Sequence, residues 1–383
     1  MPTALHRLPV EYLIRRSTLR PDGRRFDFYS FAAKPPRPAA LDPEPQPEPA
    51  AGAVLEADLR ELRWHPFFRT WNLVTGDRHL RPTMPDGCPF CPGGAEALSD
   101  FQLAAFDNRF PALVPDPPPP SEAAFPAARR PAAGRAEVIV YSPGHEGRFS
   151  TLAAEDVLRL LAVWADRERE AFLDPAVSFV FPFENRGEDA GNTLSHPHGQ
   201  LFAFPFLPPR VDEKLASLGA FRERHHDCLF CALGRMEESG PRQLYNGQYV
   251  NVYVPDFARF PFETHVTLRA HGQGSLQLPE ASAREFAACL LAVSQALDSL
   301  FDQPMPGMMC LYPAPRPADG DWHLHAEFLP LMRTAGRLKR LAAVESGLGA
   351  VVVDEAPEQM AASLRRVFPP LPWPEVTVRR PPE

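Results

Sequence analysis

The fold and the chemistry of this chain can be read outward from residues 195–204, which are SHPHGQLFAF. His196 and His198 project to the same side of an extended backbone, because side chains two apart on a strand share a face. One of them can bind a metal ion while the other carries out chemistry. Gln200 adds an uncharged amide to the same face, and Gly199 leaves room for a ligand beside the backbone. The alternative is an edge strand with its polar residues outward, so the rest of the chain must decide.

Length and composition limit the possible functions. The chain has 383 residues, is 44% hydrophobic and carries a formal net charge of -8. This length predicts two domains or two fused halves. The negative charge argues against nucleic acid as the main partner. No apolar run reaches the roughly 18 residues of a membrane span, and the amino terminus lacks the apolar segment of a signal peptide. We expect a soluble, cytoplasmic protein that binds neither nucleic acid nor membrane.

The sequence divides into three parts. Residues 1–60 are expected to form an amino-terminal arm followed by a linker, because residues 35–49 alternate proline with alanine and acidic residues. The aromatic group Phe26–Phe31 within the arm predicts a short strand. The arm either docks onto another subunit or is a poorly ordered tail. Residues 61–210 form the first half of the remaining chain, and residues 211–383 form the second.

Four of the six cysteines form two Cys-x-x-Cys pairs, Cys88/Cys91 and Cys228/Cys231. In a reducing cytosol such pairs favour metal binding or redox chemistry over structural disulfides. Cys289 and Cys310 stand alone, and we expect them to be buried as small hydrophobic residues.

The two halves repeat the same order of features. In each half, a Cys-x-x-Cys pair precedes a strand that runs to a histidine, then an amphipathic helix, then a His-x-His motif. The two histidines of a half are 51 residues apart in the first half (145 to 196) and 52 in the second (271 to 323). Such agreement indicates a repeat with two closed Cys2His2 sites, which suit structural zinc. The expected ligands are Cys88, Cys91, His145 and His196 in the first half, and Cys228, Cys231, His271 and His323 in the second. His225 and His226 are competing ligands for the second site.

The order of short motifs resembles one known family. The motifs are Cys-x-x-Cys, Asn-x-Phe, Ser-Pro-x-His, Phe-Glu-Asn-x-Gly, His-Pro-His-Gly-Gln, Pro-Phe-Glu and His-x-His-x-Glu. From about Arg63 to about Arg366 the chain is similar to the galactose-1-phosphate uridylyltransferases, which belong to the histidine-triad superfamily. The resemblance implies an α+β fold of two histidine-triad-like halves in pseudo-repeat, each an antiparallel sheet flanked by helices. It also implies a homodimer in which the subunits share residues across their active sites.

The resemblance assigns His198 the role of nucleophile. It would attack the α-phosphorus of UDP-glucose, form a uridylyl-histidine and release a hexose 1-phosphate, and galactose 1-phosphate would then take the uridylyl group to give UDP-galactose. Neutral imidazole is both a good nucleophile and a good leaving group near pH 7. The zinc-bound His196 would hold its carbonyl against the other ring nitrogen of His198. Gln200 can only hydrogen-bond phosphoryl oxygens, whereas hydrolases of the superfamily carry a third histidine there, so a transferase is favoured.

Further residues are assigned to the substrate by the resemblance. Spacing alone favours a solvated pair for Arg78 and Arg81, but they fall where the family has phosphate-contacting arginines. Other matches are Asn108 and Asn185 near the nucleoside and phosphates, Thr193 as a hydroxyl for phosphate, and Lys339 and Glu345 at the hexose. Two contexts depart from the family pattern: residues 192–194 are Asn-Thr-Leu where many relatives have Cys-Ser-Asn, and residues 343–345 are Ala-Val-Glu rather than glycine-aromatic-glutamate.

The second His-x-His motif is expected to be structural. His325 occupies the position of the nucleophile, and Glu327 stands where the first half has Gln200. A carboxylate there would repel an incoming phosphate. The leading hypothesis for the whole chain is a UDP-glucose–hexose-1-phosphate uridylyltransferase of galactose metabolism. The alternatives are a sugar-nucleotide phosphorylase of the ADP-glucose type, and a zinc-stabilised nucleotide-binding protein without turnover.

Overall fold

The computed structural model describes residues 3–7, 11–20, 22–33, 59–80, 87–91, 94, 96, 101–317 and 320–373. In this part of the chain, twelve strands form one sheet in which every strand is antiparallel to its neighbours. In spatial order they are β1 (Thr3–Arg7), β2 (Tyr12–Leu19), β3 (Arg25–Ala32), β6 (Leu103–Asp107), β8 (Arg135–Val140), β10 (His198–Phe204), β9 (Phe179–Arg186), β14 (Gly307–Tyr312), β15 (His325–Pro330), β13 (Thr264–Leu268), β12 (Val250–Tyr253) and β11 (Gln243–Asn246).

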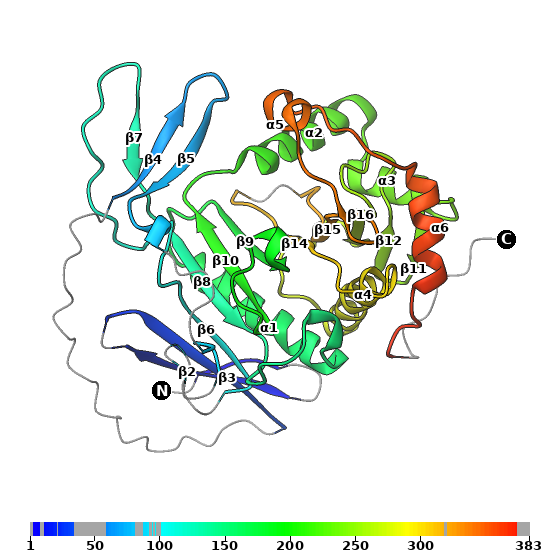
Figure 1. Cartoon of the computed structure of the whole chain (residues 1–383), viewed down its shortest axis with the longest axis horizontal. Coiled ribbons are helices and arrows are strands. Elements are labelled where there is room, and N and C mark those ends of the chain that lie inside the picture. The colour runs from blue at the N-terminus through cyan, green and yellow to red at the C-terminus, as the bar shows by residue number, and fades with distance from the viewer. Residues whose placement is uncertain are drawn as a thin grey trace.

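The order of strands is mirrored about the β9–β14 pair. Strands β10, β8 and β6 follow β9 on one side, and β15, β13 and β12 follow β14 on the other. Each side places its His-x-His strand, β10 or β15, directly beside the central pair. The expected α+β pseudo-repeat is therefore present, and the two halves join edge to edge into one continuous sheet (Figure 1).

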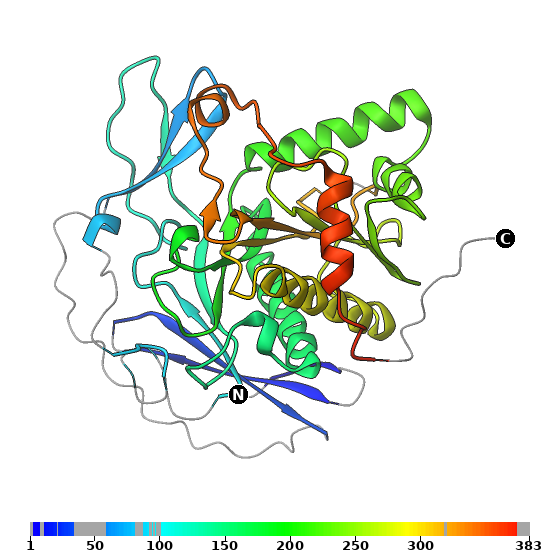
Figure 2. The same cartoon turned by 45° about the vertical axis from the view of Figure 1, so that its right-hand side comes forward.

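Two long helices cover one face of this sheet. They are α1 (Ala154–Ala171) and α4 (Glu280–Ser299), and they lie side by side in both views (Figures 1 and 2). These are the amphipathic helices expected in the two halves, and their apolar side chains Trp164 and Phe286 are buried in the largest core cluster. Because α1 and α4 occupy this face, the side chains of His198 and Gln200, which alternate with Leu201, are presented on the opposite face.

The other helices lie around the second half. Helices α2 (Pro209–His225) and α3 (Leu229–Glu237) pack with Tyr312 and Trp322 on the face opposite α1 and α4. Helix α6 (Pro357–Val367) packs against α4 and β11, and α5 (Ala343–Leu348) precedes it. Short 3-10 helices are η1 (Arg78–Leu80), η2 (Phe149–Thr151) and η3 (Glu188–Ala190). Of the helices in the described residues, none combines the length and the apolar character needed to cross a membrane.

Smaller sheets flank the main one. One of them is a hairpin of β4 (Arg60–His65) and β5 (Thr70–Thr75), to which β7 (Arg129–Pro131) adds a third strand. This small sheet projects away from the body (Figure 1). Strands β16 (Met332–Thr334) and β17 (Arg337–Leu338) form a second short pair.

The arm contributes strands to the main sheet. The strand expected near Phe26–Phe31 is β3, which pairs with β6 along four residues, Phe26 to Tyr29. Arg167 of α1 fastens it to its neighbours. This guanidinium is 1% exposed and donates to Asp27 Oδ2 at 2.7 Å and to both carboxylate oxygens of Glu137 at 2.6 and 2.8 Å. A bidentate, charge-assisted contact of this kind fixes three elements together. The β2–β3 hairpin is thus an integral part of the sheet, next to the edge strand β1.

Glu168 of α1 is expected to make the free energy of unfolding depend on pH. Its side chain is 4% exposed and accepts hydrogen bonds from Ser275 Oγ and the Leu276 amide, both at 3.0 Å, and burial raises its pKa to about 7. The folded chain therefore binds a proton that the unfolded chain releases near pH 4.5, so stability is lost as pH rises through 7. We expect Glu168→Gln to abolish a loss on the order of 2 kcal/mol between pH 5.5 and 8.5.

Urea midpoints of the two proteins at pH 5.5, 7 and 8.5 measure this effect. Glu184, whose pKa burial also raises to about 7, titrates in both proteins, so its contribution cancels in the difference. Parallel pH profiles for the two proteins would contradict the assignment.

Candidate active site

The structure brings the four expected ligands of the first half together. One ligand atom from each of Cys88, Cys91, His145 and His196 lies within 4.8 Å of the other three. Cys91 Sγ is 3.4 Å from His145 Nδ1 and 3.8 Å from His196 Nδ1, and Cys88 Sγ is 3.6 Å from His196 Nδ1. The Nε2 of His196 donates to the Ser142 carbonyl at 2.8 Å, which leaves the Nδ1 lone pair directed at the thiols.

This donor set fits tetrahedral zinc. Zinc–sulfur and zinc–nitrogen bonds of ~2.3 and ~2.05 Å place sulfur and nitrogen roughly 3.6 Å apart across a tetrahedron. The sulfur–nitrogen distances of 3.4 to 3.8 Å bracket that value. Burial lowers the pKa of His196, which favours the neutral imidazole that a metal requires. Four protein ligands complete the shell, so zinc would supply rigidity here rather than an open coordination position.

His198 is positioned by the backbone of His196. Its Nδ1 donates to the His196 carbonyl at 2.8 Å. Because a carbonyl oxygen only accepts, the ring carries its proton on Nδ1 and its lone pair on Nε2. His196 thus has two roles: its side chain faces the two thiols, and its carbonyl orients His198. Phe90, between the two cysteines, contacts His198 edge to face, with ring centroids 5.1 Å apart.

Gly199, between His198 and Gln200, is required for a different reason from the ligand contact that we expected. A Cβ on Gly199 would lie 2.1 Å from the Tyr141 hydroxyl and 2.8 Å from the Phe183 carbonyl oxygen. Our expectation that Gly199 makes room for a ligand was therefore wrong, because the Tyr141 side chain from the helix-covered face fills that space. Glycine here allows Tyr141 to pack against the strand directly behind the side chains of His198 and Gln200.

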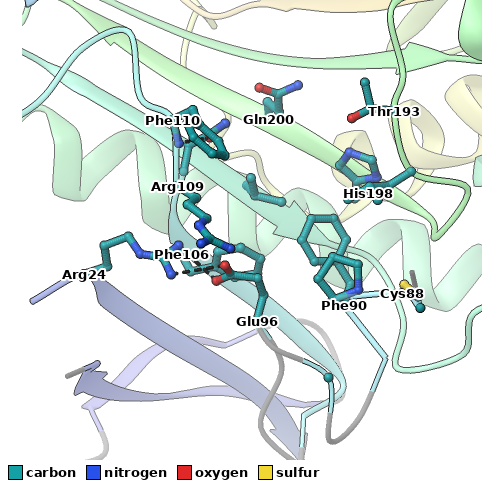
Figure 3. Close-up of a pocket in the computed structure, with 16 residues that line it drawn as sticks. Arg24, Cys88, Phe90, Glu96, Phe106, Arg109, Phe110, Thr193, His198 and Gln200 are labelled. Carbon is teal, nitrogen blue, oxygen red and sulfur yellow. Dashed lines mark hydrogen bonds and ion pairs between the residues drawn. The ribbon is translucent and has the colours of Figure 1, made fainter. Parts of the chain in front are cut away.

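His198 lines a cavity of about 330 Å³ on the open face of the sheet. Aromatic and aliphatic side chains form most of its wall, and Figure 3 shows Phe90, Phe106 and Phe110 among them. Asn108, Thr193 and Gln200 supply polar groups, while Arg24, Glu96 and Arg109 lie on the side away from His198 (Figure 3). Flat apolar walls with a few convergent polar groups are typical of a small-molecule site. A second cavity of about 580 Å³, between the halves, also includes His198 and Thr193 in its lining.

The predicted substrate residues fall into two groups. His198, Gln200, Asn108 and Thr193 line the smaller cavity. The second group lines neither cavity and consists of Arg78 on η1, Asn185 on β9, Lys339 and Glu345. In this group Asn185 pairs with Met308 of β14, and Lys339 forms an ion pair with Glu345 at 3.0 Å. Arg81 lies outside the described residues. Sequence reasoning missed Arg24, Glu96 and Arg109. For Arg24 the reason is that only the fold brings the β2–β3 turn to this cavity.

The second Cys2His2 group is also assembled. Ligand atoms of Cys228, Cys231, His271 and His323 lie within 4.8 Å of one another. His323 Nε2 is 3.5 Å from Cys228 Sγ and 3.6 Å from Cys231 Sγ, and the distance from Cys231 Sγ to His271 Nδ1 is 3.9 Å. His323 Nδ1 donates to the Leu268 carbonyl at 2.7 Å. These distances also fit tetrahedral zinc, and His225 and His226 are not in the group.

His325 in the second half has the frame of His198 but a different environment. Its Nδ1 contacts the His323 carbonyl at 2.8 Å, as in the first half. However, Lys214 of α2 places its Nζ 2.6 Å from His325 Nε2 and 2.6 Å from Glu327 Oε1. Burial, followed by the charge of Lys214, holds the pKa of His325 well below its usual value. Glu327 is paired with Lys214 and with Arg259, at 2.7 Å, so its charge is compensated. The lone pair that would attack a phosphate is therefore already engaged by Lys214.

Comparisons with known proteins agree with this geometry. Residues 58–208 match a family model described as "Galactose-1-phosphate uridyl transferase, N-terminal domain". The galactose-1-phosphate uridylyltransferase of Thermotoga maritima is 35% identical over 80% of this chain and 98% of its own length. The structure is similar to one named "Structure of uridylyltransferase", with a TM-score of 0.76, 30% identity, and coverage of 80% of this chain and 98% of the other.

The fold is also shared more widely. An ADP-glucose phosphorylase from Arabidopsis thaliana has a TM-score of 0.63 at 20% identity, over 80% of this chain and 98% of that one, which shows a common fold alone. The Thermotoga maritima relative is 35% identical to this chain, and the match spans 98% of its length, which is enough to establish membership of the same family. Together with the paired Cys2His2 groups and the His196–His198 frame, it shows that this chain belongs to the galactose-1-phosphate uridylyltransferase family.

Proposed function

We propose that this chain is a UDP-glucose–hexose-1-phosphate uridylyltransferase that acts in galactose metabolism. The observation that carries the proposal is the 2.8 Å hydrogen bond from His198 Nδ1 to the His196 carbonyl. It fixes the lone pair on Nε2 of a histidine that lines an aromatic-walled cavity. A neutral imidazole held in this tautomer is a suitable nucleophile toward phosphorus.

The reaction proceeds in two displacements. His198 Nε2 forms a bond to the α-phosphorus of UDP-glucose as the bond from that phosphorus to the bridging oxygen breaks, and glucose 1-phosphate leaves with the electron pair. A phosphate oxygen of galactose 1-phosphate then attacks the same phosphorus. The nitrogen–phosphorus bond breaks, His198 regains its lone pair and UDP-galactose departs. A covalent uridylyl-histidine links the two steps, so the kinetics are ping-pong.

Gln200 favours transfer over hydrolysis. It lies two residues after His198 on β10 and lines the same cavity. Its amide can donate hydrogen bonds to phosphoryl oxygens as charge develops on them, but its N–H groups are too weakly acidic to transfer a proton to a poor leaving group. A hexose 1-phosphate leaves as an anion without needing that proton, whereas many hydrolase substrates do need it.

The remaining features complete the proposal. Each Cys2His2 group holds one structural zinc, and the thiolates require a reducing compartment, which supports a cytoplasmic location. We propose a homodimer with shared active sites. In that assembly Arg78, Arg81, Lys339 and Glu345 would serve the phosphates and hexose of the partner's site, which explains why those that are described line neither cavity of their own chain.

Transfer of label from the donor tests this function. We expect UDP-glucose labelled at the α-phosphate to leave base-stable, acid-labile label on the protein, and galactose 1-phosphate to discharge that label as UDP-galactose. Phosphoramidates of histidine have this stability pattern, whereas ester and acyl phosphates differ. Labelling from ADP-glucose alone, discharged by inorganic phosphate, would instead support a sugar-nucleotide phosphorylase. No label from either donor would exclude both enzymes.

A further inference from the structure

The β2–β3 hairpin reaches the cavity of His198 from outside the family match. That match begins at residue 58, whereas the hairpin is formed by residues 12–32. Its turn places Arg24 in the cavity lining. The turn is held close to the cavity wall because the Arg25 amide donates to Asp107 Oδ2 at 2.8 Å and the Phe26 ring stacks on Phe106, with centroids 4.5 Å apart. Arg24 is therefore a fixed part of the cavity.

Arg24 forms an ion pair with Glu96 at the cavity wall. Its Nη1 is 2.9 Å from Glu96 Oε2, and its Nη2 donates to Glu96 Oε1 at 3.1 Å. Its Nε donates to Asp22 at 2.8 Å, and Nη1 also donates to the Asp107 carbonyl at 3.3 Å. Three of these contacts are hydrogen bonds and the Nη1–Oε2 contact is an ion pair, so among the described residues one N–H on Nη1 and one on Nη2 have no hydrogen-bond acceptor. Glu96 is 6% exposed.

The cavity thus presents an acceptor with donors beside it. Glu96 Oε1 accepts one hydrogen bond from Arg24 and keeps a second lone pair, while Oε2, which faces Arg24 at 2.9 Å and Arg20 at 3.7 Å, has no hydrogen-bond partner among the described residues. Arg24 and Arg109 both line the cavity near Glu96, on the side away from His198 (Figure 3). Phe90, Phe106 and Val138 also line the cavity, and their apolar surfaces suit a flat ring. A nucleotide with its α-phosphate at His198 would therefore bring the edge of its base to Glu96.

Uracil complements this arrangement. Its hydrogen-bonding edge presents one N–H, at N3, between two carbonyl oxygens. Cytosine presents a bare nitrogen and an amino group at the corresponding positions, so its lone pair would face the carboxylate and its amino group the guanidinium. Adenine has the same mismatch. Guanine offers an N–H beside a carbonyl but is a larger ring system.

We infer that Arg24 and Glu96 select the base of the donor nucleotide as uracil, with Glu96 accepting the N3–H and Arg24 donating to a neighbouring carbonyl oxygen. The inference rests on the proposed function, because it requires the nucleoside to lie in this cavity. It assigns a substrate-specificity role to the amino-terminal arm. A purely structural Arg24–Glu96 pair would support the cavity for all nucleotides equally.

The ratio of kcat/KM for UDP-glucose to that for CDP-glucose tests the inference, because the two donors have the same size. We expect Glu96→Gln to lower this ratio by about 10- to 100-fold, since the amide can turn either its oxygen or its nitrogen to the base. Arg24→Gln should also lower the ratio. Glu170→Gln is the matched control, because Glu170 pairs with Arg25 of the same hairpin at 2.8 Å but does not line the cavity. That variant should keep the ratio of the unsubstituted protein.

Equilibrium binding of UMP and CMP, measured by calorimetry, gives a second readout that needs no turnover. An equal loss for both nucleotides in Glu96→Gln and Arg24→Gln would overturn the inference and assign the pair to structure. The inference would also be overturned if the ratio of kcat/KM for UDP-glucose to that for CDP-glucose were the same in the control and in both variants. If the unsubstituted protein takes label from UDP-glucose but these ratios do not change, only this inference fails. If it takes no label, the proposed function itself has failed.

Discussion

Replacement of His198 by asparagine is expected to lower kcat for uridylyl transfer by a factor on the order of 10⁴ or more, and to abolish labelling of the chain. The variant removes the Nε2 lone pair that forms the bond to phosphorus, and no other described group on that strand can replace it. An asparagine amide can still donate to the His196 carbonyl, which His198 Nδ1 contacts at 2.8 Å. The fold and the Cys2His2 group should therefore persist. Release of glucose 1-phosphate and retention of labelled α-phosphate measure the two losses.

His325→Asn is the matched control for this variant. His325 has the same contact to the preceding histidine carbonyl, at 2.8 Å, but its Nε2 faces Lys214 at 2.6 Å rather than the cavity of His198. We expect this variant to keep catalytic activity and to lose stability, because Lys214 loses a buried acceptor. Equal losses of activity in the two variants would contradict the division into a catalytic half and a structural half, as would a His198→Asn variant that retains turnover.

The sequence was sufficient to predict the parts that repeat. Two sets of Cys and His at nearly equal spacing indicated both four-residue groups, and the structure brings each set within 4.8 Å. Once His196 was assigned to the first group, His198 remained as the candidate nucleophile. The amphipathic helix expected in each half is present as α1 or α4, and the apolar side chains Trp164 and Phe286 of these helices are both buried. These features are encoded by local periodicity and by a repeat within one chain, so they can be read without a structure.

Other features depended on contacts between distant segments. Composition indicated an arm before residue 60, but not that β3 would pair with β6 or that Arg24 would reach the cavity. We expected the charge of Glu327 to make the second half inactive, whereas Lys214 of α2 neutralises that charge and engages His325 directly. Likewise the reason for Gly199 is the Tyr141 hydroxyl, which would lie 2.1 Å from the Cβ of any other residue at this position. These contacts join residues that are far apart in the sequence, and they depend on how the whole sheet packs. They therefore leave no periodic pattern that could be recognised in the sequence.

Loss of the first Cys2His2 group should cost activity as well as metal. In Cys91→Ser the group loses the thiol that contacts both histidines, at 3.4 Å to His145 and 3.8 Å to His196. Without zinc to hold its ring, His196 no longer fixes the carbonyl that orients His198. We expect the zinc content to fall from two atoms per chain to one, and kcat to fall by roughly 100-fold, at the upper end of what the loss of a supporting residue around a metal usually costs.

Cys231→Ser in the second half separates the catalytic from the structural contribution of zinc. Cys231 Sγ contacts His271 at 3.9 Å and His323 at 3.6 Å, and the His323 carbonyl contacts His325, which has no role in the proposed reaction. This variant should lose the same single zinc atom and a comparable part of its thermal stability, because metal binding contributes directly to folding. Its kcat should stay near that of the unsubstituted protein. Elemental analysis, thermal unfolding and turnover of the two variants, measured side by side, test this distinction. Equal losses of kcat would show that zinc acts through general stability. A loss of kcat confined to Cys91→Ser would show that the first zinc acts through the His196 carbonyl. Fewer than one zinc per chain in the unsubstituted protein would contradict both assignments.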